Sequence, residues 1–347
     1  MSASTLARRG YSMPAEWTSH EATWIAWPHE TKDWPGRFAP IPWAYGELVR
    51  LLSRNERVRI LVGDVALEKK AHAVLTKVGV DLAKIDFYRV PTDRVWTRDS
   101  GAIFVTNKRG ERIATHWKFN GWAKYPNHKR DDAVAAKIAK ALKTEEHRVL
   151  VGEREIVLEG GAIEVDGAGL LMATEECLLS NVQARNPGLG RAGTEKVLAD
   201  TLGVKRVIWL DRGIVGDDTH GHIDDLARFV APGRVLLCQE KNESDENYAL
   251  LRDNLERLKT EKVEVIPLPM PAAVFFDRQR LPASYANFYI ANGVVIVPTF
   301  NDPMDRIALG ILADCFPDRE VVGFHAVDFV WGLGTVHCAT QQEPKKL

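Results

Sequence analysis

The chain has 347 residues, of which 45% are hydrophobic and 27% are charged, a composition typical of a soluble globular protein with a large core. Its formal net charge of −1 gives no electrostatic basis for a nucleic-acid or anionic-membrane partner. The N-terminal segment lacks the apolar core of a signal peptide, and the four scattered cysteines argue against a disulfide framework or a zinc knuckle. We therefore expect a cytoplasmic protein with a small-molecule partner.

Strand-like and helix-like segments alternate along the chain. Short apolar runs typical of strands occupy residues 23–27, 58–62, 206–210 and 263–267. Helical periodicity covers residues 43–53, 67–78, 131–142, 193–202, 243–258 and 305–315. Since no low-complexity tract or Ser/Gly-rich linker interrupts this alternation, the sequence predicts an α/β fold in which residues 1–347 form a single domain.

A short phrase recurs at the start of three strand-like runs, with an acid three residues ahead of each run. The pairs of acid and run are Asp99 with 102–105, Glu159 with 162–165, and Asp224 with 227–230. Each run leads through a turn into a second apolar run, which is typical of a β-hairpin. A weaker fourth copy begins at Asn287, so the period is roughly 60 residues.

A hairpin module repeated at this period predicts equivalent units arranged around a centre. A fifth unit would combine the strand at 23–27 with the C-terminal segment 332–342, which would bring the two ends of the chain together. An ordinary α+β fold also has hairpins between helices, but packing alone does not require the acids to keep their phase. In equivalent units Asp99, Glu159 and Asp224 converge on one site, and three gathered acids suit a cationic ligand.

The densest polar cluster occupies residues 216–225 and reads Gly-Asp-Asp-Thr-His-Gly-His-Ile-Asp-Asp. His220 and His222 have a spacing that metal ligands use, while one histidine beside a carboxylate also suits general acid–base catalysis. In a TIM-barrel amidohydrolase such a string belongs to the first strand, and too few residues follow His222 to complete a barrel of about 250 residues. A helix cap would account only for residues 217–219. We favour acid–base chemistry and expect no metal.

One cysteine differs from the others in its surroundings. Cys177, Cys238 and Cys315 lie in apolar segments that fit core packing, whereas Cys338 follows a glycine-rich, polar stretch. A thiol with a pKa of about 8.5 is mostly protonated at neutral pH, so attack by Cys338 needs an imidazolium or a cationic substrate nearby. His337 is adjacent, but neighbours along a strand point to opposite faces, so we expect His222 to be the partner.

Motifs spread over nearly the whole chain, in order, resemble those of the agmatine deiminase family, which includes bacterial peptidylarginine deiminases. They are Met13-Pro-Ala-Glu-Trp, Trp24-Ile-Ala-Trp-Pro-His29, Trp96-Thr-Arg-Asp99-Ser-Gly, Phe119-Asn-Gly-Trp122, Glu159-Gly-Gly, Asp218-Thr-His-Gly-His222-Ile-Asp224, Leu281-Pro-Ala-Ser-Tyr-Ala-Asn-Phe-Tyr and His337-Cys338-Ala-Thr-Gln-Gln342. The resemblance implies the pentein fold, a five-bladed α/β propeller of ββαβ-type units with the active site on its axis.

The resemblance also implies a role for each matched residue. Cys338 is the nucleophile, His222 the general acid and then base, and Glu159 orients His222. Asp99 and Asp224 hold the guanidinium, whose planar N–H donors suit paired carboxylates. The implied reaction is hydrolysis of agmatine to N-carbamoylputrescine and ammonia through a covalent thiouronium intermediate, with no cofactor and with a homodimer as the expected assembly.

The far end of the site bears on which guanidine is bound. Asp218 matches the position at which the family binds the agmatine amine, and Trp96 and Trp122 suit either the walls of a channel or the core. The sequence departs from the family pattern at His220, where Asn is common, and at Gly334-Thr-Val before the His-Cys pair. The alternatives are a deiminase of free or peptidyl arginine or another guanidine, a metal-dependent amidohydrolase, and a propeller that binds a guanidine without turnover.

Overall fold

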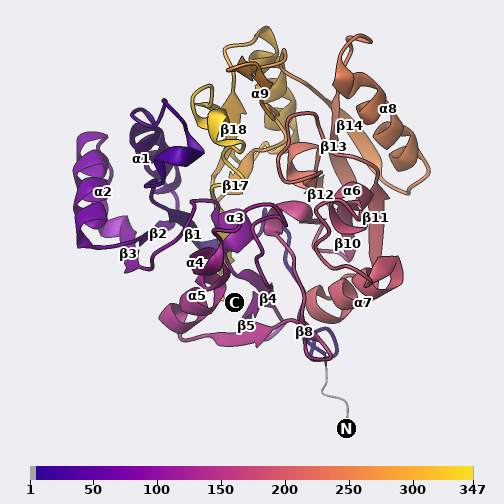
Figure 1. The fold of residues 1–347 in the computed structure, drawn as a ribbon, viewed down its shortest axis with the longest axis horizontal. Coiled ribbons are helices and arrows are strands. Elements are labelled where there is room, and N and C mark those ends of the chain that lie inside the picture. Colours follow the sequence, from indigo (N-terminus) through magenta and orange to yellow (C-terminus); the bar gives the residue numbers. More distant parts are fainter. Residues whose placement is uncertain (1–4, 347) are drawn as a thin grey trace.

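The computed structural model describes residues 5–346, and within them five sheets of three or four strands share one plan (Figure 1). In each sheet one strand pairs antiparallel with one neighbour and parallel with another, and helical segments connect the parallel strands. The unit is therefore a hairpin, a helix and a parallel strand. This is the mixed α/β arrangement that the sequence predicts.

The first sheet joins the two ends of the described chain. Its strands are β1 (His20–Ala26), β2 (Arg57–Val62), β3 (Ile85–Arg89) and β20 (Gln341–Pro344), and its helices are α1 (Ile41–Leu52) and α2 (Val65–Lys77). Strand β20 runs antiparallel to β1, with Gln342 opposite Thr23. The expected pairing of the C-terminal segment with the first strand is thus confirmed, although most of residues 332–340 lie in turns ahead of that strand.

The other four of these sheets each begin with a predicted hairpin. Their strands are β4 (Ile103–Thr106), β5 (Arg112–His116) and β6 (Glu145–Arg148); β9 (Glu164–Val165), β10 (Leu170–Thr174) and β11 (Arg206–Leu210); β12 (Ala227–Ala231), β13 (Arg234–Gln239) and β14 (Glu264–Pro269); and β17 (Tyr289–Ala291), β18 (Val294–Thr299) and β19 (Glu320–His325). All four antiparallel pairs, including the weaker fourth copy, are confirmed. Two short ribbons pair β7 (Leu150–Val151) with β8 (Arg154–Glu155) and β15 (Phe275–Phe276) with β16 (Gln279–Arg280).

The longer helices lie around the outside of the view in Figure 1, and the short α3 lies near its middle. The remaining helices are α3 (Thr97–Ser100), α4 (Lys129–Asp132), α5 (Val134–Leu142), α6 (Glu175–Leu178), α7 (Gly190–Leu202), α8 (Glu246–Lys259) and α9 (Pro303–Cys315), with 3-10 turns η1 (Thr31–Asp33), η2 (Leu82–Lys84), η3 (Gly160–Ala162), η4 (Ile223–Asp225) and η5 (Phe329–Gly332). The helix expected at 131–142 is divided at Ala133 into α4 and α5.

Local sequence explains where the helices start. Helix α9 begins with a capping box, in which the Asp302 carboxylate accepts the Met304 N–H and the Asp305 carboxylate accepts the Asp302 N–H. Helix α8 starts at Glu246, three residues later than its periodicity suggests, because the Asp245 side chain caps it by accepting the Asn247 N–H. Such caps fix the helix ends against the sheet edges.

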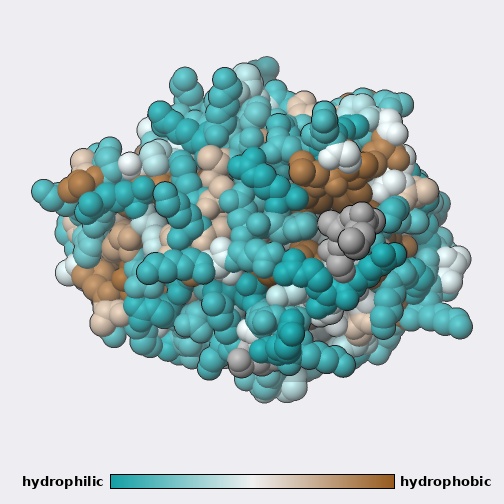
Figure 2. Space-filling view, turned by 90° about the horizontal axis from the view of Figure 1, so that it is seen from below, coloured by the Kyte–Doolittle hydropathy of each residue, from teal (hydrophilic) through white to brown (hydrophobic). Residues whose placement is uncertain are grey.

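The core consists of two apolar clusters. The larger contains fully buried aromatic side chains such as Trp24, Tyr285 and Phe329, and the smaller packs Ile103, Leu171 and other side chains between the β4–β5 and β9–β10 hairpins. The face in Figure 2 is mostly hydrophilic with limited hydrophobic patches. Within residues 5–346 no helix has the length and apolar character to cross a membrane.

Candidate active site

The three phased acids lie on three short helical turns that contact one another. Asp99 lies in α3, Glu159 caps η3, and Asp224 lies in η4, so each acid stands just ahead of the first strand of its hairpin. All three carboxylates are buried, the most exposed being Asp99 at 5%. The repeat in the sequence therefore brings the three acids to one place.

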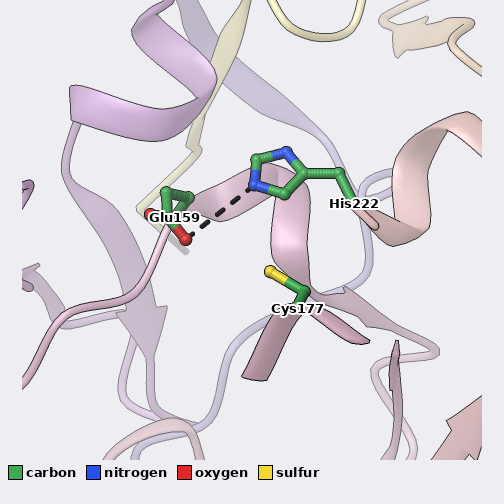
Figure 3. A group of neighbouring side chains, drawn as sticks. All are labelled: Glu159, Cys177 and His222. Atoms are coloured by element: carbon green, nitrogen blue, oxygen red, sulfur yellow. Dashed lines mark ion pairs between the residues drawn. The ribbon is translucent and has the colours of Figure 1, made fainter. Parts of the chain in front are cut away.

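His222 lies among these acids without forming a close hydrogen bond to any of them. Its Nδ1 is 3.9 Å from Asp99 Oδ1 and 3.9 Å from Asp224 Oδ1, and its Nε2 is 3.8 Å from Glu159 Oε2. Figure 3 shows the imidazole directed toward Glu159. Burial lowers the pKa of His222, but the charge of Asp99 and contacts with Cys177 and Glu159 outweigh it, so the pKa is raised well above its ordinary value. The ring is an imidazolium at neutral pH.

Gly161 provides the room in which the acids approach His222. A Cβ at this position would lie 2.6 Å from His222 Nδ1 and 3.0 Å from both the Asp99 and the Asp224 carboxylates. Its N–H donates to Asp99 Oδ1 (3.1 Å), and Trp122 Nε1–H donates to Asp99 Oδ2 (2.9 Å). The glycine pair of the Glu159-Gly-Gly motif is thus needed for close approach.

Asp99 and Glu159 have opposite electrostatic environments. Burial, together with the charges of Asp224 and Glu159, raises the pKa of Asp99 to about 6, although His222 opposes the shift. Burial would also raise the pKa of Glu159, but the Arg185 guanidinium and the His222 ring outweigh burial and lower that pKa to about 2. Glu159 is therefore a permanent carboxylate, whereas Asp99 gains its charge near neutral pH.

The sequence reasoning missed Arg185, which holds Glu159 in place. Its Nε donates to Glu159 Oε1 (2.9 Å), and its terminal nitrogens donate to the carbonyls of Gln183 (2.9 Å) and Thr219 (2.5 Å). The side chain of Arg185 is fully buried in this contact. No repeat or cluster marks Arg185 in the sequence, because its partners come from distant segments.

Cys338 lies beside Asp224 and lines a pocket. Its Sγ is 3.7 Å from Asp224 Oδ2 and accepts a hydrogen bond from Asn287 Nδ2 (3.1 Å). Burial and the charges of Asp224, Asp225 and Asp99 raise the pKa of the Cys338 thiol well above its ordinary value. In the ligand-free protein this cysteine is therefore a thiol.

His337 and Cys338 lie in a turn and not in a strand, so the expected alternation of their side chains does not apply, and both approach Asp224 Oδ2. His337 Nδ1 lies 2.7 Å from Asp224 Oδ2 and its Nε2 lies 2.7 Å from Glu16 Oε2. Glu16 also receives hydrogen bonds from Arg98 (3.2 Å) and Arg228 (3.0 Å). His337 thus bonds Asp224 and Glu16 together, and Arg98 supports the same buried group through Glu16.

A pocket leads from the surface to Cys338. Its volume is about 120 Å³, and its lining includes Asp99, Trp96, Trp122 and Cys338. Asp218 also lines this pocket, so the structure brings the residue expected to bind an amine into the same cavity as the expected nucleophile. Both tryptophans are largely buried and line the cavity, which combines the two roles considered for them.

Cys177 is buried in the smaller apolar cluster, as expected, and it also lies beside the polar site. Its Sγ, a nitrogen of His222 and a carboxylate oxygen of Glu159 all lie within 4.8 Å of one another (Figure 3). Asp225, next to Asp224, is a further buried acid that was not singled out, and burial and the charge of Asp224 raise its pKa well above the ordinary value. Cys177 lies in α6 and Asp225 in η4.

Two groups in residues 5–346 have the character of metal ligands, Glu159 with Cys177 and His222, and Asp224 with Asp225 and Cys338. A cation in the first group would face the Arg185 guanidinium, which is already paired with Glu159. His220 and His222, the metal-ligand pair that the sequence suggested, do not occur together in either group within residues 5–346. His220 Nε2 instead lies 3.4 Å from Ser180 Oγ.

The model of the Porphyromonas-type peptidyl-arginine deiminase family matches residues 12–344. Agmatine deiminase of Pseudomonas fluorescens is 35% identical over 98% of this chain and 97% of its own length. The solved agmatine deiminase of Enterococcus faecalis has a TM-score of 0.90 at 32% identity and covers 100% of this chain and 99% of its own. C. jejuni agmatine deiminase with substrate bound has a TM-score of 0.88 at 30% identity, covering 97% of each chain. The chain therefore belongs to the Porphyromonas-type peptidyl-arginine deiminase family, as its agmatine deiminase-like motifs predict.

Proposed function

We propose that this protein hydrolyses agmatine to N-carbamoylputrescine and ammonia. The observation that carries the proposal is the cluster of buried acids beside His222 and Cys338, in which Glu159 Oε2 and Asp224 Oδ1 have no hydrogen-bond partner within residues 5–346. A planar guanidinium supplies donors of the right charge for such a cluster. Likeness over the full chain to agmatine deiminases, one with substrate bound, supports agmatine as the guanidine.

In the proposed mechanism Asp99 and Asp224 hold the guanidinium over Cys338. As the cation binds, the Cys338 thiol releases its proton to solvent, and the thiolate sulfur attacks the guanidinium carbon to form a C–S bond. The C–N bond then breaks, and ammonia leaves with a proton from the His222 imidazolium. A water molecule attacks the resulting thiouronium carbon while neutral His222 accepts its proton, and the C–S bond breaks to release the ureido product and the thiol.

The charges around the site support this division of roles. In the absence of substrate, burial and three neighbouring acids raise the pKa of Cys338 and favour the thiol. A bound cation would offset the charge of those acids and favour the thiolate. His222 is already an imidazolium, the form needed to protonate the leaving ammonia. Glu159, with a pKa of about 2, keeps its charge and stabilises that imidazolium. No step in this scheme needs a metal or cofactor.

The remaining parts of the proposal concern the far end of the site and the whole molecule. Asp218 binds the substrate's terminal ammonium, and Trp96 and Trp122 pack along its methylenes. We place the five similar sheets in a five-bladed pentein propeller that forms one domain, a view supported by β20 returning to β1. A cytoplasmic location and a homodimer remain expectations from the sequence and the family resemblance.

Product formation from agmatine, arginine and a peptidyl-arginine substrate, measured by ureido colorimetry and ammonia release, tests the proposal. We expect turnover of agmatine alone, with Cys338→Ala as the inactive control. If arginine or the peptide were turned over in preference to agmatine, the assigned substrate would be wrong, but the deimination reaction would stand. Activity that survives thiol alkylation and is lost on chelation would overturn the mechanism.

A further inference from the structure

Asp218, which lines the pocket, is already paired with an ammonium group that belongs to the protein. Lys124 Nζ forms an ion pair with Asp218 Oδ1, and Tyr125 donates its hydroxyl hydrogen to Asp218 Oδ2 (2.6 Å). The Asp218 side chain is 13% exposed and the Lys124 side chain 43%. The carboxylate expected to receive the substrate's amine is thus paired with a half-exposed lysine.

A single turn carries groups to both ends of the pocket. In residues 121–125, Trp122 and Ala123 have the left-handed φ values of 57° and 54°, and the Asn120 side chain accepts the Ala123 N–H (2.8 Å). Trp122 Nε1–H donates to Asp99 at the inner end, while Lys124, two residues later, reaches Asp218 at the outer end. The turn therefore places Lys124 next to Asp218, and the Lys124 side chain is 43% exposed to solvent.

The other charges at the outer end have partners of their own. Arg94 pairs with Asp33 and lies over the Tyr125 ring, with its guanidinium carbon 4.1 Å from the ring centroid. Lys32 also lines the pocket, and no ion pair joins it to Asp218 in the described chain. Lys124 is thus the cation whose removal would specifically uncover Asp218.

We propose that the Lys124 ammonium is a displaceable stand-in for the terminal ammonium of the substrate, and that it sets the affinity for diamine-like guanidines. This inference rests on the proposed function, because it takes Asp218 as the acceptor of the agmatine amine. Without substrate, Lys124 compensates a carboxylate that is mostly removed from water. An incoming primary ammonium has the same charge and donors, so it can replace Lys124 only by breaking that ion pair.

The inference distinguishes two ligands that differ only at the outer end. Agmatine carries an ammonium on its four-carbon chain, whereas n-butylguanidine has the same chain and guanidinium without the amine. Agmatine must displace Lys124, while n-butylguanidine leaves the ion pair intact. Removing the lysine charge should therefore tighten agmatine and leave n-butylguanidine unchanged.

The test measures dissociation constants by titration calorimetry in a Cys338→Ala background, with Lys124→Met as the variant. In Lys124→Met we expect the dissociation constant of agmatine to decrease by about twofold to fivefold. This is the range that corresponds to breaking a partly exposed ion pair. For n-butylguanidine we expect no change. Lys32→Met is the control, because it removes one positive charge from the lining of the pocket without uncovering Asp218. Its effect on the agmatine dissociation constant should be smaller than that of Lys124→Met.

Two results would overturn the inference. One is an agmatine dissociation constant that is unchanged or increased in Lys124→Met, and the other is an equal tightening of both ligands, which would indicate a general charge effect. A loss of arginine affinity in Lys124→Met without tighter agmatine would instead make Lys124 a carboxylate receptor. Turnover of agmatine by the wild-type protein tests the proposed function separately, so either idea can fail while the other stands.

Discussion

Two buried clusters of charged side chains meet at Asp224, and they differ in how many of their polar atoms have hydrogen-bond partners. Behind Asp224, both oxygens of Glu16 are paired: Oε1 accepts from Arg228 and the Ile290 N–H, and Oε2 contacts Arg98 and His337. In front of Asp224, several buried polar atoms have no hydrogen-bond partner within residues 5–346. These are Glu159 Oε2, His222 Nδ1 and Nε2, Asp224 Oδ1 and Asp225 Oδ1.

The pKa directions of Glu16, Asp99 and Asp225 follow this difference, whereas Arg185 and His222 lower the pKa of Glu159 in the front cluster to about 2 despite its burial. Burial opposes the charge of Glu16, but Arg228, His337 and Arg98 outweigh it and lower the pKa of Glu16 well below its ordinary value. In the front cluster burial and neighbouring acids raise the pKa of Asp99 and of Asp225. The rear cluster therefore stabilises the fold by itself, whereas the front cluster is completed only when a cation binds.

The largest expected effect lies in the front cluster, at Cys338. Cys338→Ser should lower kcat by on the order of 10⁴ or more, because a serine hydroxyl is a far weaker nucleophile without a strong base beside it. The folded state should be unaffected, since the substitution replaces sulfur by oxygen in the same geometry. Steady-state kinetics and thermal unfolding measure the two effects.

Cys315→Ser is the matched control, because Cys315 is half-exposed at the end of α9 and carries no role in the proposed mechanism. It should retain wild-type kcat. If Cys338→Ser kept substantial activity, covalent catalysis by this residue would be wrong.

The next effect belongs to the rear cluster. Glu16→Gln leaves Arg98 and Arg228 without their shared carboxylate in a buried site, which should cost about 3–5 kcal/mol in the free energy of unfolding. Urea denaturation monitored by tryptophan fluorescence measures this loss. An unfolding free energy equal to that of the wild type would mean that the rear cluster does not stabilise the fold.

In the front cluster, Asp99→Asn should lower activity and raise the stability of the folded protein. Losing one of the two guanidinium-binding carboxylates should lower kcat/KM by roughly 10²- to 10³-fold. Because the pKa of Asp99 rises from 3.8 in the unfolded chain to about 6 in the folded protein, stability falls as pH rises through this window. The asparagine avoids that penalty, so at pH 7 to 8 we expect a gain of at most about 3 kcal/mol, fading below about pH 4.

Thermal unfolding of both proteins across pH 4 to 8 measures this difference. A melting temperature that is lower for Asp99→Asn throughout that range would show that the front cluster is satisfied without a ligand, and the contrast between the two clusters would be lost.

The features that repeat along the chain could be predicted from the sequence. The hairpins, the phased acids Asp99, Glu159 and Asp224, and the return of the C-terminus to the first strand all follow from local patterns. Residues that act only through distant partners could not be predicted. Arg185 and Cys177 look ordinary in the sequence, because their contacts to Glu159 and His222 exist only after three separate segments have folded together.

Helix boundaries show the same limit on a smaller scale. The periodicity over 131–142 is helical, yet the structure divides it at Ala133. At the break Asp131 accepts the backbone N–H groups of Asp93 (2.7 Å) and Arg94 (3.1 Å), which come from the loop before α3. Such a tie between a helix and a loop nearly forty residues away has no local signal.

The smallest expected effect tests how Arg185 supports the front cluster. Arg185→Lys keeps the positive charge but loses the fork that bonds Glu159, Gln183 and Thr219 together. The pKa of Glu159 should then rise from about 2 toward its ordinary value, and its support of the His222 imidazolium should weaken. We expect kcat to fall by about tenfold. Because Glu159 would then become protonated at a higher pH than in the wild type, the acid limb of the kcat profile should move to higher pH.

The pH dependence of kcat separates this positioning role from a merely structural one. Arg154→Lys is the matched control, since Arg154 is exposed and bonds only the Pro187 carbonyl, and its profile should coincide with that of the wild type. A loss of stability in Arg185→Lys without any shift of the acid limb would confine Arg185 to packing. A shifted limb with KM little changed would instead mean that Arg185 acts on the chemistry through Glu159, because a residue that only maintained the pocket would alter substrate binding as well.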